Sequence, residues 1–178
     1  ATPGNAVDFG DLLVPRSSAA SCSDDTYGLF AGGNGDIAGY ASIDYVIIAT
    51  PGNAANFGDM TLNRWDHAGC SDGTYGLFAG GLTQTEGGGT VTNAINVIDY
   101  VTIATPGNAI DFGDLTAIRS YSASCSDGIY GVFAGGGTSY PGGSYFTIDY
   151  VTIATPGNAT EFGDLMFLKN WLAGCSGA

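Results

Sequence analysis

A phrase of about fifty residues, repeated along the chain, limits what this sequence can fold into. Each copy begins with Ala-Thr-Pro-Gly-Asn-Ala and passes through the same order of motifs to a single cysteine. The copies start at Ala1, Ala49, Ala104 and Ala154, and their cysteines are Cys22, Cys70, Cys125 and Cys175. This self-similarity predicts one domain of similar units, with repeats at 1–48, 49–103 and 104–153 and a partial repeat at 154–178.

The basic residues also belong to the repeat. Each lies five positions after an aspartate and six before the cysteine of its copy. They are all the lysines and arginines of the chain: Arg16, Arg64, Arg119 and Lys169. Because a charge inside a sheet is costly unless it is paired, we expect each to have a structural role rather than to bind a ligand. Each is expected to donate hydrogen bonds to backbone carbonyls or to a carboxylate of the set Asp44, Asp99 and Asp149.

Charge and hydropathy exclude several classes of partner. The chain has 178 residues, and a hydrophobic content of 44% suffices for a real core. Its net charge of −13 repels phosphate backbones, so nucleic acid is not an expected partner. No apolar run approaches the length that spans a bilayer, so membrane insertion is not expected either.

Strand patterns dominate the sequence. It contains 30 glycines, and no segment keeps apolar residues at helical spacing, so we expect an all-β fold. Asp72-Gly73 predicts a tight hairpin before a strand at Tyr75–Ala79, and residues 98–104 are predicted to form a strand buried on both faces. The Thr-Pro-Gly-Asn segments predict type II turns, and the Phe-Gly-Asp motif after each predicts a further strand. Each repeat thus supplies four strands.

One segment of each repeat changes its length: residues 34–42, 82–97 and 137–147. Insertions confined to one place usually mark loops on one face of a repeat array, which is often the binding face. Their mixture of Tyr, Ser, Thr, Asn and Gly is typical of binding loops. The candidate ligand-binding residues are Tyr40, Gln84, Glu86, Asn93, Tyr140, Tyr145 and Phe146. The alternative is that these segments are only solvated hairpin ends.

Metal and catalytic chemistry find little support in the sequence. The cysteines lie at equivalent positions of separate repeats, too far apart for disulfides, so buried free thiols are expected. Close cysteine pairs are absent and the Asp-x-Gly-Asp stretches lack the ligand density of calcium loops, so neither metal nor cofactor is predicted. His67 is the only histidine and no nucleophile motif occurs, so no catalytic residue and no enzyme is predicted. A carboxylate pair for glycoside hydrolysis is a weaker alternative.

The order of motifs resembles the kelch repeat. The tetrapeptide Arg-Trp-Asp-His beginning at Arg64 resembles its Arg-x-x-His opening, and the doublet beginning at Gly80 resembles its glycine pair. A departure is that Phe57 lies twelve residues after Tyr45, a longer spacing than kelch repeats use. The longer phrase Ile-Asp-Tyr-Val-Thr-Ile-Ala-Thr-x-Gly-Asn-Ala-x-Asp-Phe-Gly-Asp-Leu resembles repeats in structural proteins of marine and cyanobacterial tailed phages.

These resemblances imply kelch-like β-propeller blades, three whole and one split. A closed ring needs about four blades or more, so we expect either that the chain is part of a longer polypeptide or that other chains complete the ring. Its lack of an initiator methionine indicates either a processed product or an excerpt of a longer protein. A threefold β-prism is the alternative within one chain. The expected function is a non-enzymatic structural or adhesion protein of a virion, such as a tail fibre, or of a cell surface. Its expected partners are itself, other structural proteins of the same assembly, or a cell-surface receptor. A lectin-like module that binds surface glycans is the alternative.

Overall fold

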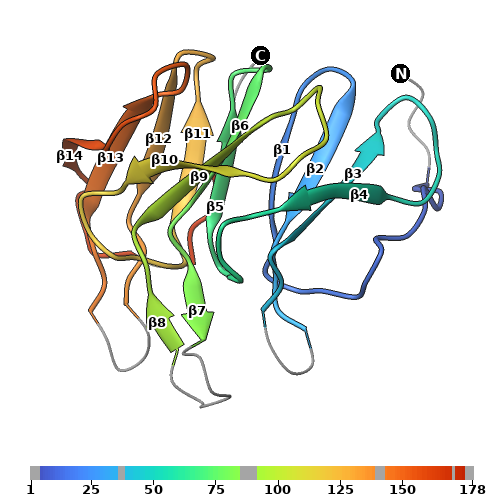
Figure 1. Ribbon diagram of the computed structural model, residues 1–178. Coiled ribbons are helices and arrows are strands. Elements are labelled where there is room, and N and C mark those ends of the chain that lie inside the picture. The colour runs from blue at the N-terminus through green and yellow to red at the C-terminus, as the bar shows by residue number, and fades with distance from the viewer. Residues whose placement is uncertain (1–4, 36–38, 85–91, 139–142, 170, 175–178) are drawn as a thin grey trace.

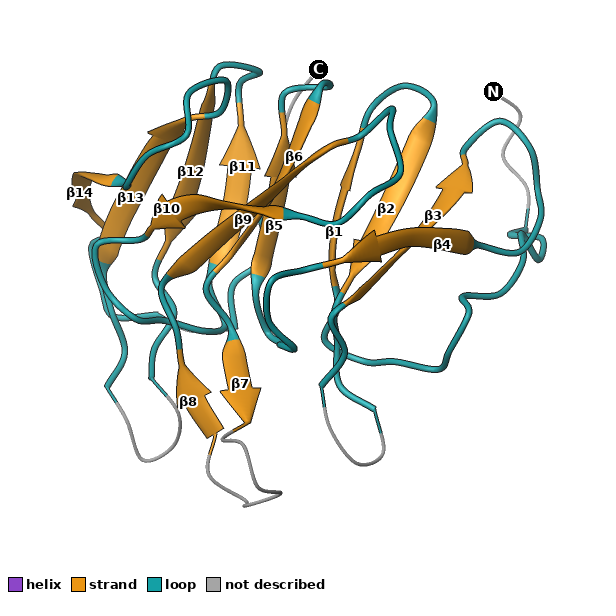
Figure 2. Cartoon of the chain, viewed as in Figure 1, coloured by secondary structure: helices purple, strands orange, loops and turns teal. Residues whose placement is uncertain are grey.

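The structure is a computed structural model that describes residues 5–35, 39–84, 92–138, 143–169 and 171–174. Within these ranges all regular structure is β-strand, and no helix occurs (Figure 2). It follows that no helix in the described part of the chain is long and apolar enough to cross a membrane. The predicted all-β class is confirmed.

The described strands form three four-stranded antiparallel sheets and one short hairpin (Figure 1). Sheet 1 contains β1 (Ala20–Ser23), β2 (Tyr27–Ala31), β3 (Ser42–Ile47) and β4 (Ala55–Asp59). Sheet 2 contains β5 (Ala68–Ser71), β6 (Tyr75–Ala79), β9 (Val97–Thr102) and β10 (Ile110–Asp114). Sheet 3 contains β11 (Ala123–Ser126), β12 (Tyr130–Ala134), β13 (Thr147–Thr152) and β14 (Thr160–Asp164). The hairpin pairs β7 (Leu82–Gln84) with β8 (Thr92–Ala94).

Each large sheet is a meander whose strands follow the chain order. The first strands β1, β5 and β11 lie beside one another, and the three sheets fan outward from them (Figure 1). The last strand of each sheet comes from the next sequence repeat, because β4 already lies beyond the second Ala-Thr-Pro-Gly-Asn-Ala phrase. Neighbouring repeats are therefore joined through shared sheets.

Aspartates close the hairpins between the first two strands of each sheet. The carboxylate Oδ1 of Asp72 accepts hydrogen bonds from the backbone N–H groups of Thr74 (2.8 Å) and Tyr75 (2.7 Å). Asp24 and Asp127 accept the same two bonds in sheets 1 and 3. Asp24 is followed by another aspartate where the other copies have glycine, so the first side chain is the common element of these turns.

In the three described copies, the predicted type II turns at Thr-Pro-Gly-Asn are wrong. The turn that ends β3 lies earlier, where Thr50 N–H donates to Ile47 O (3.0 Å), and Gly52 does not adopt the positive φ that a type II turn requires. The glycine that a close contact requires is Gly58 of the Phe-Gly-Asp motif (φ +155°), because a side chain there would overlap the carbonyl of Gly107 in the next Thr-Pro-Gly-Asn segment. Backbone contact between sheets therefore explains the glycine of Phe-Gly-Asp, whereas a side chain at Gly52 would meet no atom within 4 Å.

Two hydrophobic cores lie between the sheets. The first joins sheets 1 and 2 around Leu29, Phe57 and Phe78, and the second joins sheets 2 and 3 in the same way. Serine hydroxyls also form hydrogen bonds between the inner strands, since Ser71 Oγ of β5 donates to Ser23 O of β1 (2.6 Å). Each sheet therefore packs on its neighbour through one repeated interface.

Candidate functional site

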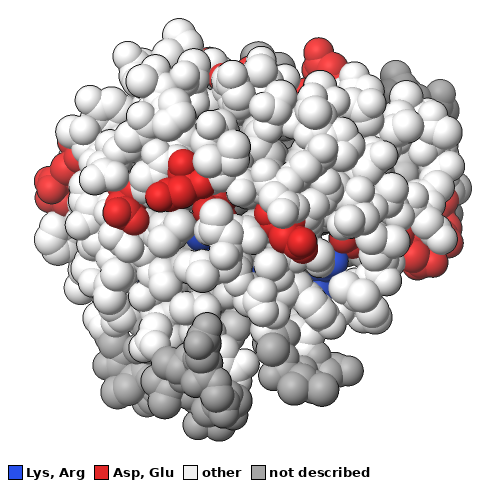
Figure 3. Space-filling model, in the orientation of Figure 1, with Lys and Arg blue, Asp and Glu red and all other residues white. Residues whose placement is uncertain are grey.

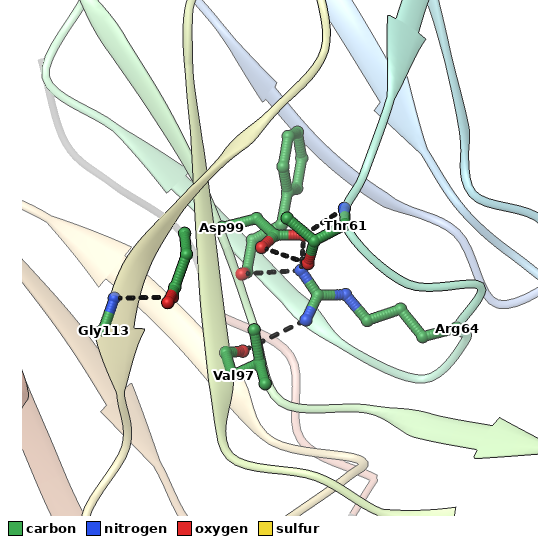
Figure 4. Close-up of polar contacts among 7 residues, drawn as sticks. Thr61, Arg64, Val97, Asp99 and Gly113 are labelled. Carbon is green, nitrogen blue, oxygen red and sulfur yellow. Dashed lines mark hydrogen bonds and ion pairs between the residues drawn. The ribbon is translucent and has the colours of Figure 1, made fainter.

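A buried ion pair lies at the base of the variable segment of sheet 2. Arg64 Nη2 lies 2.8 Å from Asp99 Oδ2, and both side chains are fully buried. The same guanidinium donates to Val97 O and Phe78 O, each at 3.1 Å (Figure 4). Burial lowers the pKa of Arg64 and the charge of Asp99 opposes this change, so the carboxylate supplies the counter-charge that a buried guanidinium needs.

The arrangement recurs in the other two sheets. Arg16 lies 3.0 Å from Asp44 and Arg119 lies 2.9 Å from Asp149, measured between guanidinium nitrogen and carboxylate oxygen. The structure therefore brings together each arginine with an aspartate that the sequence analysis named as a candidate partner. Lys169, the equivalent residue of the partial repeat, is exposed.

Each arginine also bridges the two ends of its variable segment. Arg16 Nη1 donates to Gly32 O (2.8 Å), just before residues 34–42, and to Ser42 O (2.9 Å), at their end. Arg119 Nη1 makes the same connection around residues 137–147, with Gly135 O (3.4 Å) and Thr147 O (3.0 Å). The guanidinium thus acts as a clamp at the base of each segment. We call this the arginine clamp, formed by Arg16, Arg64 or Arg119 with Asp44, Asp99 or Asp149 respectively.

A threonine completes two of the three clamps. Thr61 donates to Asp99 with its backbone N–H (2.9 Å) and with its hydroxyl (2.7 Å), and Thr116 makes the equivalent bonds to Asp149. In sheet 1 the equivalent residue is Leu13, which donates only its N–H to Asp44. Sequence reasoning missed these threonines, although their position two residues after the repeated Gly-Asp was visible in the alignment of copies.

Two tyrosines predicted to bind ligand contact the clamps. The ring of Tyr40 lies 5.3 Å from the Arg16 guanidinium, and the ring of Tyr145 lies 5.6 Å from that of Arg119. Both tyrosines are half-buried. Their faces are thereby engaged in cation–π contacts, which leaves less ring surface for a ligand.

The other loop candidates are dispersed. Gln84 and Asn93 lie on the β7–β8 hairpin, which extends from the lower end of the molecule in Figure 1. Phe146 is 45% exposed next to the clamp of sheet 3. Glu86 and Tyr140 lie outside the described residues. The described ends of all three variable segments leave the sheets at this same end (Figure 1).

The described cysteines are unpaired thiols on the first strands of the three sheets. Cys22 packs against Gly76 of the next sheet and Cys70 packs against Gly131. Burial raises the pKa of Cys70 to about 12 and also raises that of Cys22. Cys125, at the equivalent position of sheet 3, is only half-buried, and Cys175 lies outside the described residues.

His67 fills space in the core and has no polar partner. Neither ring nitrogen has a hydrogen-bond partner within the described residues, and the ring stands edge-on to Phe78 at a centroid distance of 6.1 Å. Burial, with the nearby positive charge of Arg64, holds the pKa of His67 well below its ordinary value of 6.5. The imidazole is therefore neutral at physiological pH.

Acidic side chains dominate the exposed charge. Figure 3 shows separate groups of Asp and Glu on one face, where little Lys or Arg is visible, in agreement with the burial of the clamp arginines. A hollow of about 1400 Å³ runs along the inner strands and is lined by Ser23, Ser71 and Ser126 among others. Among the described residues no cluster of His, Cys, Asp and Glu is arranged to hold a metal ion.

Comparison with protein-family models and with curated proteins finds no family and no relative that match this chain.

Proposed function

We propose that this chain is a non-enzymatic structural or adhesion protein of a virion or cell surface. In this proposal a rigid β-repeat scaffold presents three variable loops for contact with a protein or receptor. Other copies of the chain or other structural proteins of the same assembly are its further partners. The resemblance of the sequence to phage repeats suggests the setting of this function. In the proposed mechanism the loops determine which partner is bound and the sheets hold the loops rigidly.

The arginine clamp is the observation that carries this proposal. In each sheet one buried guanidinium bonds the backbone on both sides of the segment that varies among repeats. The clamp separates a constant frame from a variable insertion, so that the insertion can change without moving its base. A scaffold that displays different loops requires this separation.

The sheets are proposed to be kelch-like propeller blades. Four-stranded meanders that fan out from their first strands are the arrangement of such blades. Sheet 2 packs against both neighbours, whereas the outer faces of sheets 1 and 3 carry exposed apolar side chains. This serial order favours an arc of blades over a threefold prism, in which each sheet would pack against the other two.

Protein or receptor contact is favoured over a lectin function. A sugar-binding site needs exposed aromatic faces, and Tyr40 and Tyr145 each have one face covered by an arginine. Among the described aromatic candidates Phe146, at 45%, is the most exposed. Glycan binding remains the second candidate function, and the experiment below separates the two.

The test replaces the three variable segments by short Gly-Asn turns and keeps all clamp residues. Attachment of the fluorescently labelled protein is measured on a panel of cyanobacterial cells and on a glycan array. The replaced protein should keep its circular dichroism spectrum and melting temperature but lose attachment to cells. A matched control keeps all three variable segments at full length. It changes only Gly73 and Gly128 to asparagine, in the hairpins at the opposite end of the sheets.

Attachment that survives loop replacement, or a native chain that attaches to no cell on the panel, would count against the proposal. Binding of the native chain to the array that is lost on Phe146→Ala would establish the glycan alternative. Loss of attachment in the hairpin control would show that the binding surface lies at the other end of the sheets.

A further inference from the structure

The two outer faces of the fan are equivalent to surfaces that are buried inside it. On the face that each sheet turns toward its successor, Phe57 and Phe112 are each 3% exposed, but Phe162 of sheet 3 is 69% exposed. On the opposite face, Ile103 and Ile153 are each 1% exposed, but Ile48 of sheet 1 is 45% exposed. Sheet 3 thus lacks a successor and sheet 1 lacks a predecessor.

The open faces are complementary in shape as well as in polarity. At each internal interface a cysteine sulfur packs on a glycine that has no room for a side chain, as Cys22 does on Gly76. The two unmatched members of this series are Cys125 on sheet 3 and Gly28 on sheet 1. A Cβ atom at Gly28 would meet only ordinary contacts, at 3.5 Å and beyond. The space that Cys22 fills at Gly76 is therefore empty at Gly28.

We propose that sheet 3 of one copy packs on sheet 1 of a second copy, head to tail, and so continues the internal interface between molecules. The partner is a second copy of this chain because its sheet 1 carries the same surface that sheets 2 and 3 present to their predecessors. The inference rests on the proposed function, in that it names how the scaffold assembles. Two copies contribute six large sheets, within the range of about four to eight blades that close a propeller, so the expected product is a closed dimer.

Segment 5–11 competes with this contact. It has the same motif as β14 and already makes the contacts that β14 would make, since Asp11 N–H donates to Asn53 Oδ1 (3.0 Å) and Gly10 lies against Gly52. Docking therefore requires β14 of one copy to replace segment 5–11 of the other. That segment is weakly held, because each of its side chains is exposed.

The chain after β14 must also move. In the second copy, the space that this tail would enter is already filled by the chain that leads to β1. That chain carries the buried Arg16. Most of its side chains are exposed, since Met166 is 90%, Phe167 68% and Trp171 72% exposed. Docking would nevertheless cost the tail its contacts with sheet 3, which are the stacking of Trp171 on Tyr121 (centroids 4.1 Å apart) and the approach of Gly174 to the Ser124 carbonyl. Both displaced segments are thus among the most exposed parts of the described chain.

Sedimentation velocity over a hundredfold range of concentration tests the proposal with the full chain. The native protein should show a monomer–dimer equilibrium. Gly10→Val should raise the dimer fraction severalfold, because its side chain overlaps Gly52 and frees segment 5–11. Gly28→Ala should abolish the dimer, because its methyl group would meet Cys125 of the second copy while the monomer has room for it. Circular dichroism checks that each variant is folded.

A second pair of variants uses charge. Phe162→Lys should abolish the dimer without loss of monomer stability, whereas Thr152→Lys should leave it intact, because Thr152 and its internal equivalent Thr102 are both exposed. Alkylation of Cys125 should slow as the dimer forms. A native chain and a Gly10→Val variant that both stay monomeric would overturn the proposal, as would dimers that persist in both Gly28→Ala and Phe162→Lys. Since no variant touches a variable loop, attachment to cells is tested independently.

Discussion

Thr61 donates two hydrogen bonds to Asp99, one from its backbone N–H (2.9 Å) and one from its hydroxyl (2.7 Å). With Arg64 on the same carboxylate, both oxygens of a fully buried aspartate have partners. Buried charges are tolerated where their hydrogen bonds are satisfied in this way. In sheet 1 the equivalent carboxylate, Asp44, keeps Oδ1 without a partner within the described residues, because Leu13 has no hydroxyl.

Leu13→Thr should therefore stabilise the protein. The new hydroxyl would reach Asp44 Oδ1 as Thr61 reaches Asp99, and satisfying a buried acceptor contributes about 1 kcal/mol to the free energy of unfolding. Leu13 is 51% exposed, so little apolar burial is lost. Urea denaturation measures the change, and Leu13→Val is the matched control because it has the shape of threonine without the hydroxyl. Equal stability of the two variants would contradict the assignment.

Asp99→Asn should be strongly destabilising. It leaves the Arg64 guanidinium buried without a counter-charge, which costs about 3–5 kcal/mol in comparable pairs. Adding Arg64→Met to Asp99→Asn should recover much of the loss, since the uncompensated charge is removed. Asp111→Asn serves as the control, because that exposed carboxylate bonds only the Gly113 N–H (3.1 Å) among its described contacts. A double variant no more stable than Asp99→Asn would show that the clamp is not governed by charge.

His67→Leu should stabilise the protein, and increasingly so at acidic pH. The pKa of buried His67 lies well below the 6.5 of the unfolded chain, so below pH 6.5 the unfolded state binds a proton that the folded state does not. The free energy of unfolding of the native protein is therefore unaffected by the titration of His67 above pH 6.5. Below pH 6.5 it falls by up to about 1.4 kcal/mol for each pH unit, because protonation of His67 stabilises only the unfolded state. Leucine stands at the equivalent position of the partial repeat, as Leu172.

The measurement is the difference in unfolding free energy between the native protein and His67→Leu from pH 7.5 to 5. Burial raises the pKa of Asp66 above its ordinary value, which by itself gives the opposite trend at low pH, but Asp66 is present in both proteins and cancels to first order. A difference that does not change with pH would refute the assignment of a neutral, buried imidazole.

The thiols should react in a fixed order. At pH 8 iodoacetamide should alkylate Cys125 in the folded monomer, while Cys22 and Cys70 should react only after unfolding, because both are buried and burial raises their pKa values. Peptide mapping by mass spectrometry distinguishes the sites. Labelling of Cys70 as fast as Cys125 would mean that sheets 2 and 3 separate readily.

The strands that sequence predicted best are those with strong local signals. The hairpin strand Tyr75–Ala79 was predicted with its observed bounds, because an aspartate turn and a run of apolar residues mark both ends. The type II turn was predicted wrongly because Pro-Gly has the same local preference in a tight turn and in an extended segment. The contact of Gly58 with Gly107, distant in sequence, was likewise invisible to local reasoning.

The candidate site shows the same division. Each basic residue was expected to bond backbone carbonyls or an aspartate because a buried charge needs partners. Which carbonyls it reaches, Val97 O and Phe78 O in sheet 2, depends on how the strand ends converge. Tyr40 was expected to bind ligand because the composition of its loop is typical of binding loops. Its contact with Arg16 could not be predicted from the sequence. Ring direction is set by packing, not by residue type.

The sequence by itself determined the repeat, the all-β class and the residue types available at each repeat position, because periodicity and turn chemistry act over a few residues. Tertiary structure alone decided which sheet each segment joins, that one guanidinium spans both ends of a variable segment, and that Ile48 and Phe162 are exposed where their equivalents are buried. Those outcomes depend on contacts between residues far apart in the chain, whose distances and burial exist only once the sheets have packed.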